Sequence, residues 1–473
     1  MFPGQENSTA DCVGAGATCH IVAMPYPGRG HINPMMNLCH SLSSKHPNIL
    51  ITFVLTEEWL GILGEETTTN AGKNNIRFAT VPNVIPSELV RAKDFKGFVE
   101  AVFTKLPAPF EKVLDRLLES QPVTAIIADT YLPLICEIGV RRGIPVASLW
   151  TMSATVFSVL LHFDLVRQHR HFPIDDFSGI EEEKVDYIPG LSPTRIVDLQ
   201  PFLISRIGVM DKALQSVSLV SKLQYLLFTS PYELEPKLFD ALKTHFQIPV
   251  YPIGPSIPHP KLAAATGRGI DYFDWLDAQP KGSVLYISMG SFLSASESQT
   301  EEIVAGVVSS GVRFLLVARG DAMVAAAASA SDGRKGIVVP WCDQLRVLCH
   351  GSVGGFWTHC GLNSTLEGVY AGVPMLCWPL WWDQIPNCKA IVDDWRIGWR
   401  VQSRNRGAGG GELVRREEVA AVVKRFMDAE DENDEVREMR KRALGLGEDC
   451  RAAVAVGGTS NLTLDSFVRD ISK

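Results

Sequence analysis

Two successive series of short apolar segments, separated by helical patterns, constrain the fold of this chain more than any other feature. In the first series the expected strands are residues 18–24, 50–55, 76–80, 123–128, 145–150, 225–229 and 249–254. In the second series they are residues 283–288, 313–318, 337–339, 353–357, 374–377 and 397–401. Strands that alternate with helices pair mainly in parallel, so we predict an α/β chain with two doubly wound, Rossmann-like sheets.

The domain organisation follows from the length and from one change in composition. At 473 residues the chain exceeds what a single hydrophobic core supports, which predicts two domains. A stretch rich in proline and glycine separates the two series and is expected to be a linker. The expected parts are a flexible tail at 1–17, a first domain at 18–254, the linker at 255–270, a second domain at 271–455 and a C-terminal helix at 456–473.

Charge and cysteine usage narrow the class of protein. The net charge of −8 and the lack of a basic run argue against a nucleic-acid partner, which would bind a concentrated basic surface. The cysteines are scattered without a C-x-x-C pair, which fits a reducing compartment. The N-terminus does not resemble a secretory signal, and the uncharged stretch 144–163 divides into a strand and a capped helix. We expect a cytoplasmic monomer without a membrane span.

The segment 341–384 concentrates the polar and glycine residues that a nucleotide-sugar would need. Residues 353–357 suit a buried strand, 359–361 break it, and the next polar residues can cap a helix that continues to Tyr370. The first N–H groups of such a helix point outward, with the positive end of the helix dipole behind them, so a diphosphate is a suitable ligand. Side-chain donors at the same place are His359, Asn363 and Ser364.

The other polar positions of this segment follow the order of the groups in one ligand. Trp341 offers a flat face for a base, and Glu367, one helical turn beyond Asn363, can accept hydrogen bonds from ribose hydroxyls. Asp383 and Gln384 end the segment with groups that can read sugar hydroxyls. Base, ribose, diphosphate and sugar therefore each have a candidate partner.

Two titratable residues are expected at the carboxyl edge of the first sheet, where open α/β sheets bind ligands. His31 follows the first strand, just before a helix that Asn33 and Pro34 would start, and Asp129 follows a later strand. Within hydrogen-bond reach, the carboxylate could fix the tautomer of the imidazole, leaving the other ring nitrogen to accept a hydroxyl proton. Taken singly, His31 fits a turn residue and Asp129 a helix cap.

Two competing site types have weaker support. A nicotinamide oxidoreductase needs a glycine fingerprint after the first strand, whereas the glycines at 14 and 16 precede that strand and lack a third. Adjacent cysteine and histidine residues at 349–350 and 359–360 lack the spacing of zinc ligands, so no metal site is expected.

The segment 341–384 resembles the signature of plant secondary-product UDP-glycosyltransferases, a family 1 group with the GT-B fold, and its spacing fits without a gap. Gly30-His31, Pro34 and Asp129 also resemble that family's base and its supporting carboxylate. Leu362 and Asp343 depart from the family pattern, which usually has Trp and Pro there, and Leu362 changes the wall beside the hexose. The resemblance implies catalytic roles for His31 and Asp129, and donor contacts from Thr151, Ser291, Trp341, Cys342 (through its backbone), Gln344, His359, Gly361, Asn363, Ser364, Glu367, Asp383 and Gln384.

The resemblance also implies an activity. An inverting enzyme would transfer glucose from UDP-glucose to a hydroxyl of a small apolar acceptor, such as a phenolic, a flavonoid or another plant metabolite or hormone, giving a β-glucoside. UDP-glucose would be a co-substrate, and no separate cofactor is expected. In the resembled GT-B fold the two domains would face each other across a cleft, and the C-terminal helix would cross back onto the first domain. The alternative is a catalytically idle nucleotide-sugar-binding protein, which would keep the donor residues and lose the base.

Overall fold

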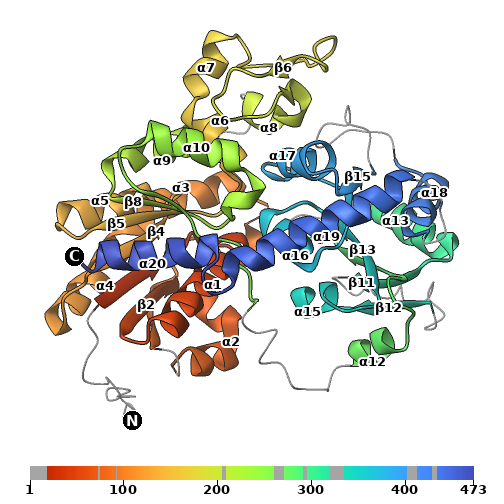
Figure 1. Cartoon of the computed structure of the whole chain (residues 1–473). Helices are drawn as coiled ribbons and strands as arrows, with labels where there is room; N and C mark the ends of the chain where they lie inside the picture. The colour runs from red at the N-terminus through yellow and green to blue at the C-terminus, as the bar shows by residue number, and fades with distance from the viewer. Residues whose placement is uncertain are drawn as a thin grey trace.

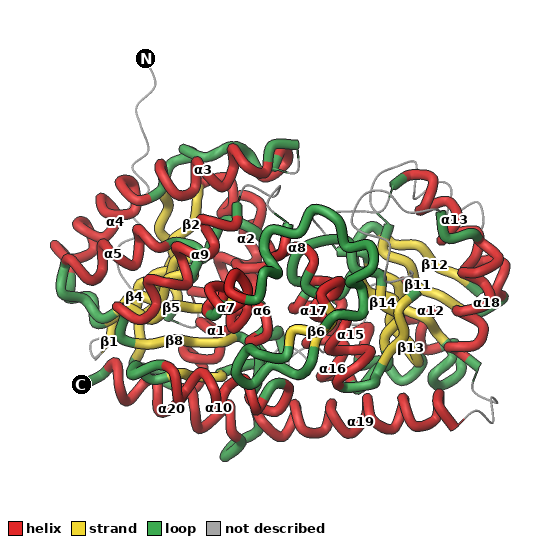
Figure 2. Tube along the Cα trace, turned by 90° about the horizontal axis from the view of Figure 1, so that it is seen from above, coloured by secondary structure: helices red, strands yellow, loops and turns green. Residues whose placement is uncertain are grey.

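A computed structural model describes residues 19–72, 75–91, 93–204, 209–259, 271–290, 296–318, 335–401, 413–428 and 434–473. The chain forms two halves, each built on a parallel sheet with helices packed against it, as Figure 1 and Figure 2 show from two directions. This confirms the predicted α/β class with two Rossmann-like domains. The predicted tail and residues 260–270 of the predicted linker lie outside the described residues.

The first half contains a seven-stranded sheet in the order β3-β2-β1-β4-β5-β8-β9, and all its pairings are parallel. Apolar side chains cover both faces, which explains why these strands are continuous apolar runs in the sequence. The strands are β1 Cys19–Met24, β2 Ile49–Thr56, β3 Ile76–Val81, β4 Ala125–Asp129, β5 Val146–Trp150, β8 Tyr225–Phe228 and β9 Val250–Pro252. The helices are α1 Arg29–Lys45, α2 Glu57–Gly72, α3 Phe95–Lys105, α4 Pro107–Ser120, α5 Pro133–Arg141, α6 Ala154–Leu161, α7 Phe163–Gln168, α8 Gln200–Leu203, α9 Met210–Leu219 and α10 Pro236–His245, and a short antiparallel pair is formed by β6 Lys184–Val185 and β7 Thr194–Arg195.

The second half contains a six-stranded parallel sheet in the order β12-β11-β10-β13-β14-β15. Two apolar clusters again fill its two faces. The strands are β10 Val284–Ser288, β11 Arg313–Val317, β12 Gly336–Val339, β13 Val353–Thr358, β14 Met375–Cys377 and β15 Gly398–Arg400. The helices are α12 Asp271–Asp277, α13 Glu297–Ser310, α15 Gln344–Leu348, α16 Leu362–Ala371, α17 Gln384–Lys389, α18 Arg416–Met427, α19 Asp434–Val454 and α20 Thr459–Ile471.

The last two helices connect the halves. In Figure 1 they form a nearly continuous blue ribbon, with α19 along the second half and α20 against the first. α20 buries Leu464, Phe467 and Ile471 in a core cluster of the first sheet. The Tyr225 hydroxyl on β8 donates to the Asp470 carbonyl at 3.1 Å.

The sequence predicted every strand of the two large sheets to within two residues at each end, but it misplaced two helix starts. α1 begins at Arg29 with Gly28 as its N-cap, so the predicted start at Asn33 and Pro34 is wrong and both residues lie inside the helix. Proline fits the helical φ angle, but it lacks the N–H and its ring crowds the carbonyl four residues earlier; here this costs one backbone bond without ending the helix. α16 begins at Leu362 after an extended Gly361. Asn363 and Ser364, the two residues predicted to cap this helix, lie inside its first turn instead.

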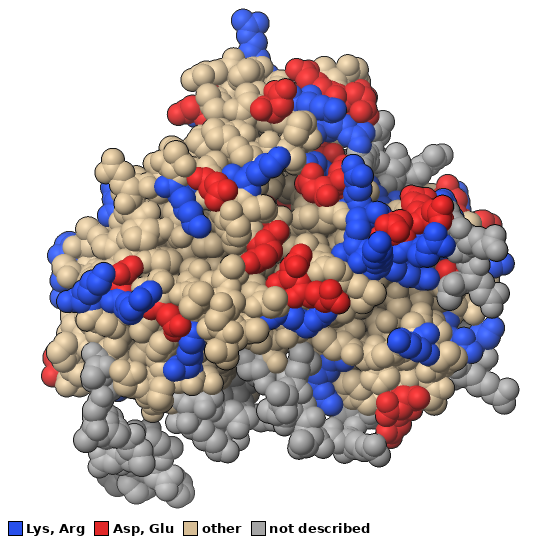
Figure 3. All heavy atoms as spheres, in the orientation of Figure 1, with Lys and Arg blue, Asp and Glu red and all other residues tan. Residues whose placement is uncertain are grey.

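Residues 144–163 form β5 and then α6, as predicted. None of the helices that the structure describes combines the length and the apolar character needed to cross a lipid bilayer. Acidic and basic side chains are interspersed on the face shown in Figure 3, which is the pattern of a solvated surface.

Candidate active site

One cavity of about 920 Å³ lies between the two halves and is lined by residues of both. The predicted site residues that line it are His31, Thr151, Trp341, Cys342, Gln344, His359, Gly361, Asn363, Ser364, Glu367, Asp383 and Gln384. Asp129 is buried behind His31, with 1% of its surface exposed. Ser291 lies outside the described residues, so its predicted donor contact stays a prediction.

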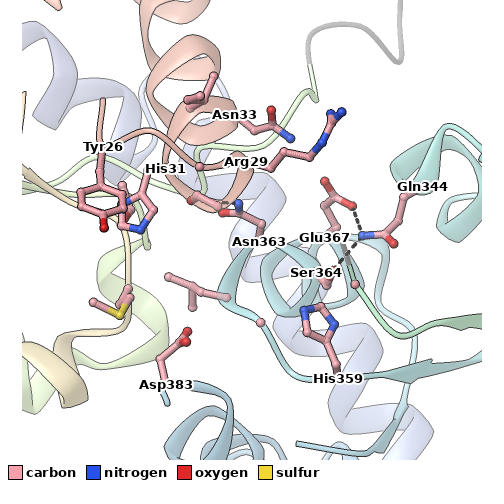
Figure 4. Close-up of a pocket in the computed structure, with 18 of the residues that line it drawn as sticks. Tyr26, Arg29, His31, Asn33, Gln344, His359, Asn363, Ser364, Glu367 and Asp383 are labelled. Carbon is pink, nitrogen blue, oxygen red and sulfur yellow. Dashed lines mark hydrogen bonds between the residues drawn. The ribbon is translucent and has the colours of Figure 1, made fainter. Parts of the chain in front are cut away.

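The first half supplies a histidine supported by a carboxylate. His31 Nδ1 lies 2.7 Å from Asp129 Oδ2, and the other carboxylate oxygen accepts from the Tyr131 backbone N–H at 2.9 Å. A carboxylate only accepts hydrogen bonds, so it favours the tautomer with the proton on Nδ1 and the lone pair on Nε2. The His31 side chain is 22% exposed and faces the cavity beside Tyr26 (Figure 4). The arrangement can take a proton from a ligand hydroxyl.

Thr151 belongs to the same group of residues. Its Oγ1 lies 2.8 Å from His31 Nδ1, so the contact seen here is with the histidine. The donor-sugar contact that the resemblance implies for Thr151 stays a prediction. Because β5 lies next to β4 in the sheet, Thr151 and Asp129 approach the imidazole from adjacent strand ends.

A proline inside α1 leaves a backbone carbonyl to which the second half bonds. Pro34 has no N–H, so the carbonyl of Gly30, four residues earlier, receives no helical hydrogen bond from it. Asn363 Nδ2, on the first turn of α16, donates to this carbonyl at 3.2 Å. The residue before His31 is therefore attached directly to the helix that follows the predicted diphosphate site.

The donor turn, residues 359–361, connects β13 to α16 and is held in a shape that requires small neighbours. Cys360 has a φ of 66°, in the left-handed region, and Gly361 is the N-cap of α16. A Cβ added at Gly290, where φ is 81°, would lie 2.5 Å from His359 Nε2, and one at Gly361 would lie 2.6 Å away. The imidazole therefore fits between two glycines at the N-terminus of a helix, where an anion is favoured.

Gln344 organises the polar groups beyond this turn. Its Nε2 donates to Ser364 Oγ at 3.0 Å and to Glu367 Oε2 at 2.7 Å, as Figure 4 shows, and its Oε1 accepts from the Tyr286 hydroxyl at 3.0 Å. Burial raises the pKa of Glu367 to about 7, and the hydrogen bond from Gln344 opposes part of that shift. Glu367 can accept from a diol when it is ionised.

The aromatic end of the cavity is open. Trp341 is 63% exposed although it is a large apolar side chain, and it lines the cavity, as a ring that stacks on a planar ligand would. Asp343, which stands where the resembled family has proline, accepts from the Arg346 N–H and caps α15. The departure at this position is therefore explained by the helix start.

The last two predicted residues lie at the start of α17. Burial raises the pKa of Asp383 to about 6, while the hydrogen bond from Asn387 and the charge of His31 act in the opposite direction. Gln384 Oε1 accepts from the N–H groups of Leu380 and Trp381 at 2.8 and 3.1 Å, so its amide nitrogen is the end that can donate to a ligand.

Sequence reasoning missed the residues that hold these groups in place. Tyr286 and Asn387 are buried and bond to predicted site residues, but nothing in the local pattern distinguishes them from core residues. The sequence also gave no sign that Cys360, Cys377 and Cys388 meet, with their sulfur atoms within 4.8 Å of one another. Cys360 and Cys377 donate weakly to backbone carbonyls, so this cluster packs behind the donor turn.

A cavity-lining histidine backed by a buried carboxylate, opposite a helix N-terminus and between two Rossmann-like halves, is the arrangement expected of a GT-B nucleotide-sugar glycosyltransferase. The family model for UDP-glucoronosyl and UDP-glucosyl transferase matches residues 254–403. UDP-glycosyltransferase 87A2 of Arabidopsis thaliana is 54% identical over 96% of this chain and 97% of its own length, and UDP-glycosyltransferase 87A1 is 52% identical over 95% and 100%. The chain therefore belongs to the plant family 1 UDP-glycosyltransferases and is a UDP-dependent glycosyltransferase.

Solved structures support the same fold. The structure of Phytolacca americana UGT2 with UDP-2fluoro-glucose and pterostilbene has a TM-score of 0.78 and 26% identity, covering 96% of this chain and all of that one (100%). Medicago truncatula UGT71G1 with UDP-glucose also has a TM-score of 0.78, at 24% identity, with 96% and 98% covered. The second likeness shows the fold alone.

Proposed function

We propose that this protein transfers glucose from UDP-glucose to a hydroxyl of a small apolar acceptor, with inversion at the anomeric carbon. The observation that carries this proposal is the His31–Asp129 pair on one wall of the cavity, with Asn363 of the opposite wall bonded to the residue before it. A protein that only held the nucleotide-sugar would not need a base beside the sugar site. The geometry therefore favours an enzyme over the idle binding protein.

The acceptor side of the cavity supports an apolar, aromatic ligand. It is lined by rings and aliphatic side chains, including Phe95, Val99, Phe103, Met152, Trp381 and Trp382. Such a lining favours the burial of a phenol or another hydroxylated apolar molecule, and Arg91 and Lys212, which line the same cavity, offer cationic partners to a polar substituent. The pterostilbene bound to Phytolacca americana UGT2 is a ligand of this chemical kind, which agrees with the proposal.

In the proposed mechanism His31 Nε2 takes the proton of the acceptor hydroxyl while Asp129 stabilises the resulting imidazolium. The acceptor oxygen forms a bond to the anomeric carbon as the bond from that carbon to the UDP oxygen breaks on the opposite face. One displacement converts an α-linked donor into a β-glucoside. His359 and the N-terminus of α16 would stabilise the negative charge that develops on UDP.

The test measures UDP release from UDP-glucose with a panel of phenols and aliphatic alcohols, using wild type, His31→Ala and the exposed control His245→Ala. We expect His31→Ala to lose activity by at least about 100-fold, while the control remains active. Proton NMR of the product should show a β-anomeric linkage. Full turnover by His31→Ala would exclude His31 as the base, and nucleotide-sugar binding without turnover in wild type would favour the idle binding protein.

The same proposal places the enzyme in the cytoplasm as a monomer. The described cysteines are all free thiols, in agreement with a reducing compartment. UDP-glucose acts as a co-substrate in this scheme. Size-exclusion chromatography with light scattering tests the monomeric state.

A further inference from the structure

Asn387 is a buried residue that bonds to two parts of the donor site. It lies on α17 with 2% of its surface exposed. Its Nδ2 donates to the Cys360 carbonyl at 3.0 Å and to Asp383 Oδ2 at 3.0 Å. A carbonyl and an ionised carboxylate are both acceptors, so only the amide nitrogen can serve both, which fixes the orientation of the side chain.

The two partners belong to different subsites. Cys360 is the central residue of the donor turn, between His359 and the N-cap of α16. Asp383 lines the cavity and is one of the two residues expected to read the sugar hydroxyls. Asn387 therefore connects the part of the site that would hold the diphosphate to the part that would hold the hexose, without lining the cavity.

We propose that Asn387 is a positioning residue that fixes the separation between the donor turn and the Asp383 carboxylate, and that it thereby selects which sugar is transferred. This inference rests on the proposed function. The sugar is bonded to the diphosphate on one side and contacted by Asp383 on the other, so a fixed separation matches one hexose outline. A shift of about 1 Å in such a contact can reduce the rate about 100-fold.

The groups around Asp383 determine its pKa, and through it the expected pH dependence of sugar transfer. His31 from α1 faces it and favours the ionised carboxylate, and Tyr131, after β4, lies near enough to be affected by its charge. Asn387 and the backbone N–H of Leu362 donate to it. Removal of the Asn387 amide leaves the burial of Asp383 less compensated, so the pKa of Asp383 should rise.

The first test compares wild type with Asn387→Asp, which keeps the size of the side chain, and with Asn387→Ala. Calorimetry measures the affinity for UDP, and kinetics measures kcat/KM for UDP-glucose, UDP-galactose and UDP-xylose with one phenol. We expect UDP affinity to stay within about 3-fold, because the donor turn is also held by β13, by α16 and by the two glycines beside His359, whereas a shift of Asp383 affects only the sugar, which UDP lacks. We expect kcat/KM for UDP-glucose to fall about 10- to 100-fold. The ratios of kcat/KM between the three UDP-sugars should become smaller, because the separation that selects one sugar is no longer fixed.

The pH profile separates positioning from a general loss of structure. In Asn387→Asp two carboxyl groups face each other, and a proton shared between them restores one donor. We expect this variant to recover part of its activity as the pH falls from 8 to 6, whereas Asn387→Ala should lose activity at a higher pH than wild type. A structural defect alone would lower activity at every pH by the same factor.

Gln299→Ala is the matched control. Gln299 is a buried amide that bonds twice to the Val414 backbone, at 3.0 Å in both directions, and it does not line the cavity. Its loss should lower the melting temperature without changing the sugar preference. The proposal is overturned if the Asn387 variants lose UDP affinity in parallel with transfer, or if their sugar preference equals that of wild type. Absence of transfer by wild type would instead overturn the proposed function, while the difference in affinity between UDP and UDP-glucose would still test Asn387.

Discussion

In the His31–Asp129 pair, the contact between a carboxylate oxygen and the imidazole is expected to set the basicity of His31. Because Asp129 Oδ2 lies 2.7 Å from His31 Nδ1, replacement by the neutral amide in Asp129→Asn removes the charge that stabilises the imidazolium. We expect kcat to fall about 100- to 10,000-fold, with UDP affinity unchanged because the proposed UDP site lies on the other wall. Steady-state kinetics and UDP calorimetry check this. Unchanged kcat would show that Asp129 serves the fold and not the reaction.

The buried Glu367 carboxylate is expected to lower the free energy of unfolding when it is ionised, which is the form that can accept from a ligand diol. Its pKa is about 7 in the folded protein against 4.5 for a free glutamate, so the folded state binds the proton more tightly. Stability is therefore lost as the pH rises from 4.5 through 7, by up to about 3 kcal/mol. Glu367→Gln should melt at a higher temperature than wild type at pH 8 and at nearly the same temperature at pH 4.5, while binding UDP more weakly. Thermal melts at the two pH values measure this, and a pH-independent difference would contradict it.

At the scale of single elements, Pro34 in α1 leaves the Gly30 carbonyl without a helical donor, and a residue of the other half donates to that carbonyl instead. In Pro34→Ala the new N–H could bond to the Gly30 carbonyl, which now accepts from Asn363. We expect the melting temperature to stay equal or rise, while kcat falls about 3- to 10-fold because α16 no longer holds the start of α1. Loss of stability together with activity would indicate that Pro34 only fills space.

The sequence was sufficient for the elements and insufficient for the contacts between them. Apolar runs such as 353–357 specify their own strand, because burial on both faces of a sheet leaves a local pattern. The order of polar residues in 341–384 also indicated which of them would line one cavity. The bond between Asn363 and Gly30 joins residues 333 positions apart and leaves no local pattern. The helix start predicted at Asn33 and Pro34 is wrong because proline is common in the first turn of a helix, and nothing in the local sequence distinguishes that position from the internal one found here.

At the scale of the whole molecule, buried charges join the two halves near the sugar-reading residues. Arg400 on β15 donates through Nη2 to Asp198 Oδ1 at 3.1 Å and through Nε to Cys388 Sγ at 3.1 Å. Asp198 ends the 3-10 turn Ile196–Asp198 of the first half, and Lys389, the last residue of α17, donates to Ser192 in the same region. The helix that begins beside the two residues predicted to read the sugar is thus attached to the first half, where the acceptor is proposed to bind.

This junction predicts a pH-dependent defect in Arg400→Met. Burial raises the pKa of Asp198 to about 6 even though Arg400 opposes the shift, so removal of the guanidinium should raise that pKa further. At pH 8 the variant then has a buried carboxylate whose cationic partner is Arg195, at 3.8 Å, and it should lose up to about 3 kcal/mol. At pH 5 the carboxyl group is largely neutral in both proteins, so the loss should be smaller. Denaturant unfolding at the two pH values measures both losses.

The double variant Asp198→Asn/Arg400→Met separates charge from packing. It has no carboxylate to ionise at position 198. At pH 8 the double variant should therefore be more stable than Arg400→Met alone. At pH 5 the difference in stability between these two variants should be smaller. UDP affinity should survive in both variants, because the proposed UDP site lies in the second half. Transfer, which is proposed to need both walls of the cavity, should fall in Arg400→Met. If the single variant is equally destabilised at both pH values, Asp198 is not the group that Arg400 neutralises, and its contact with Cys388 accounts for the stabilisation instead.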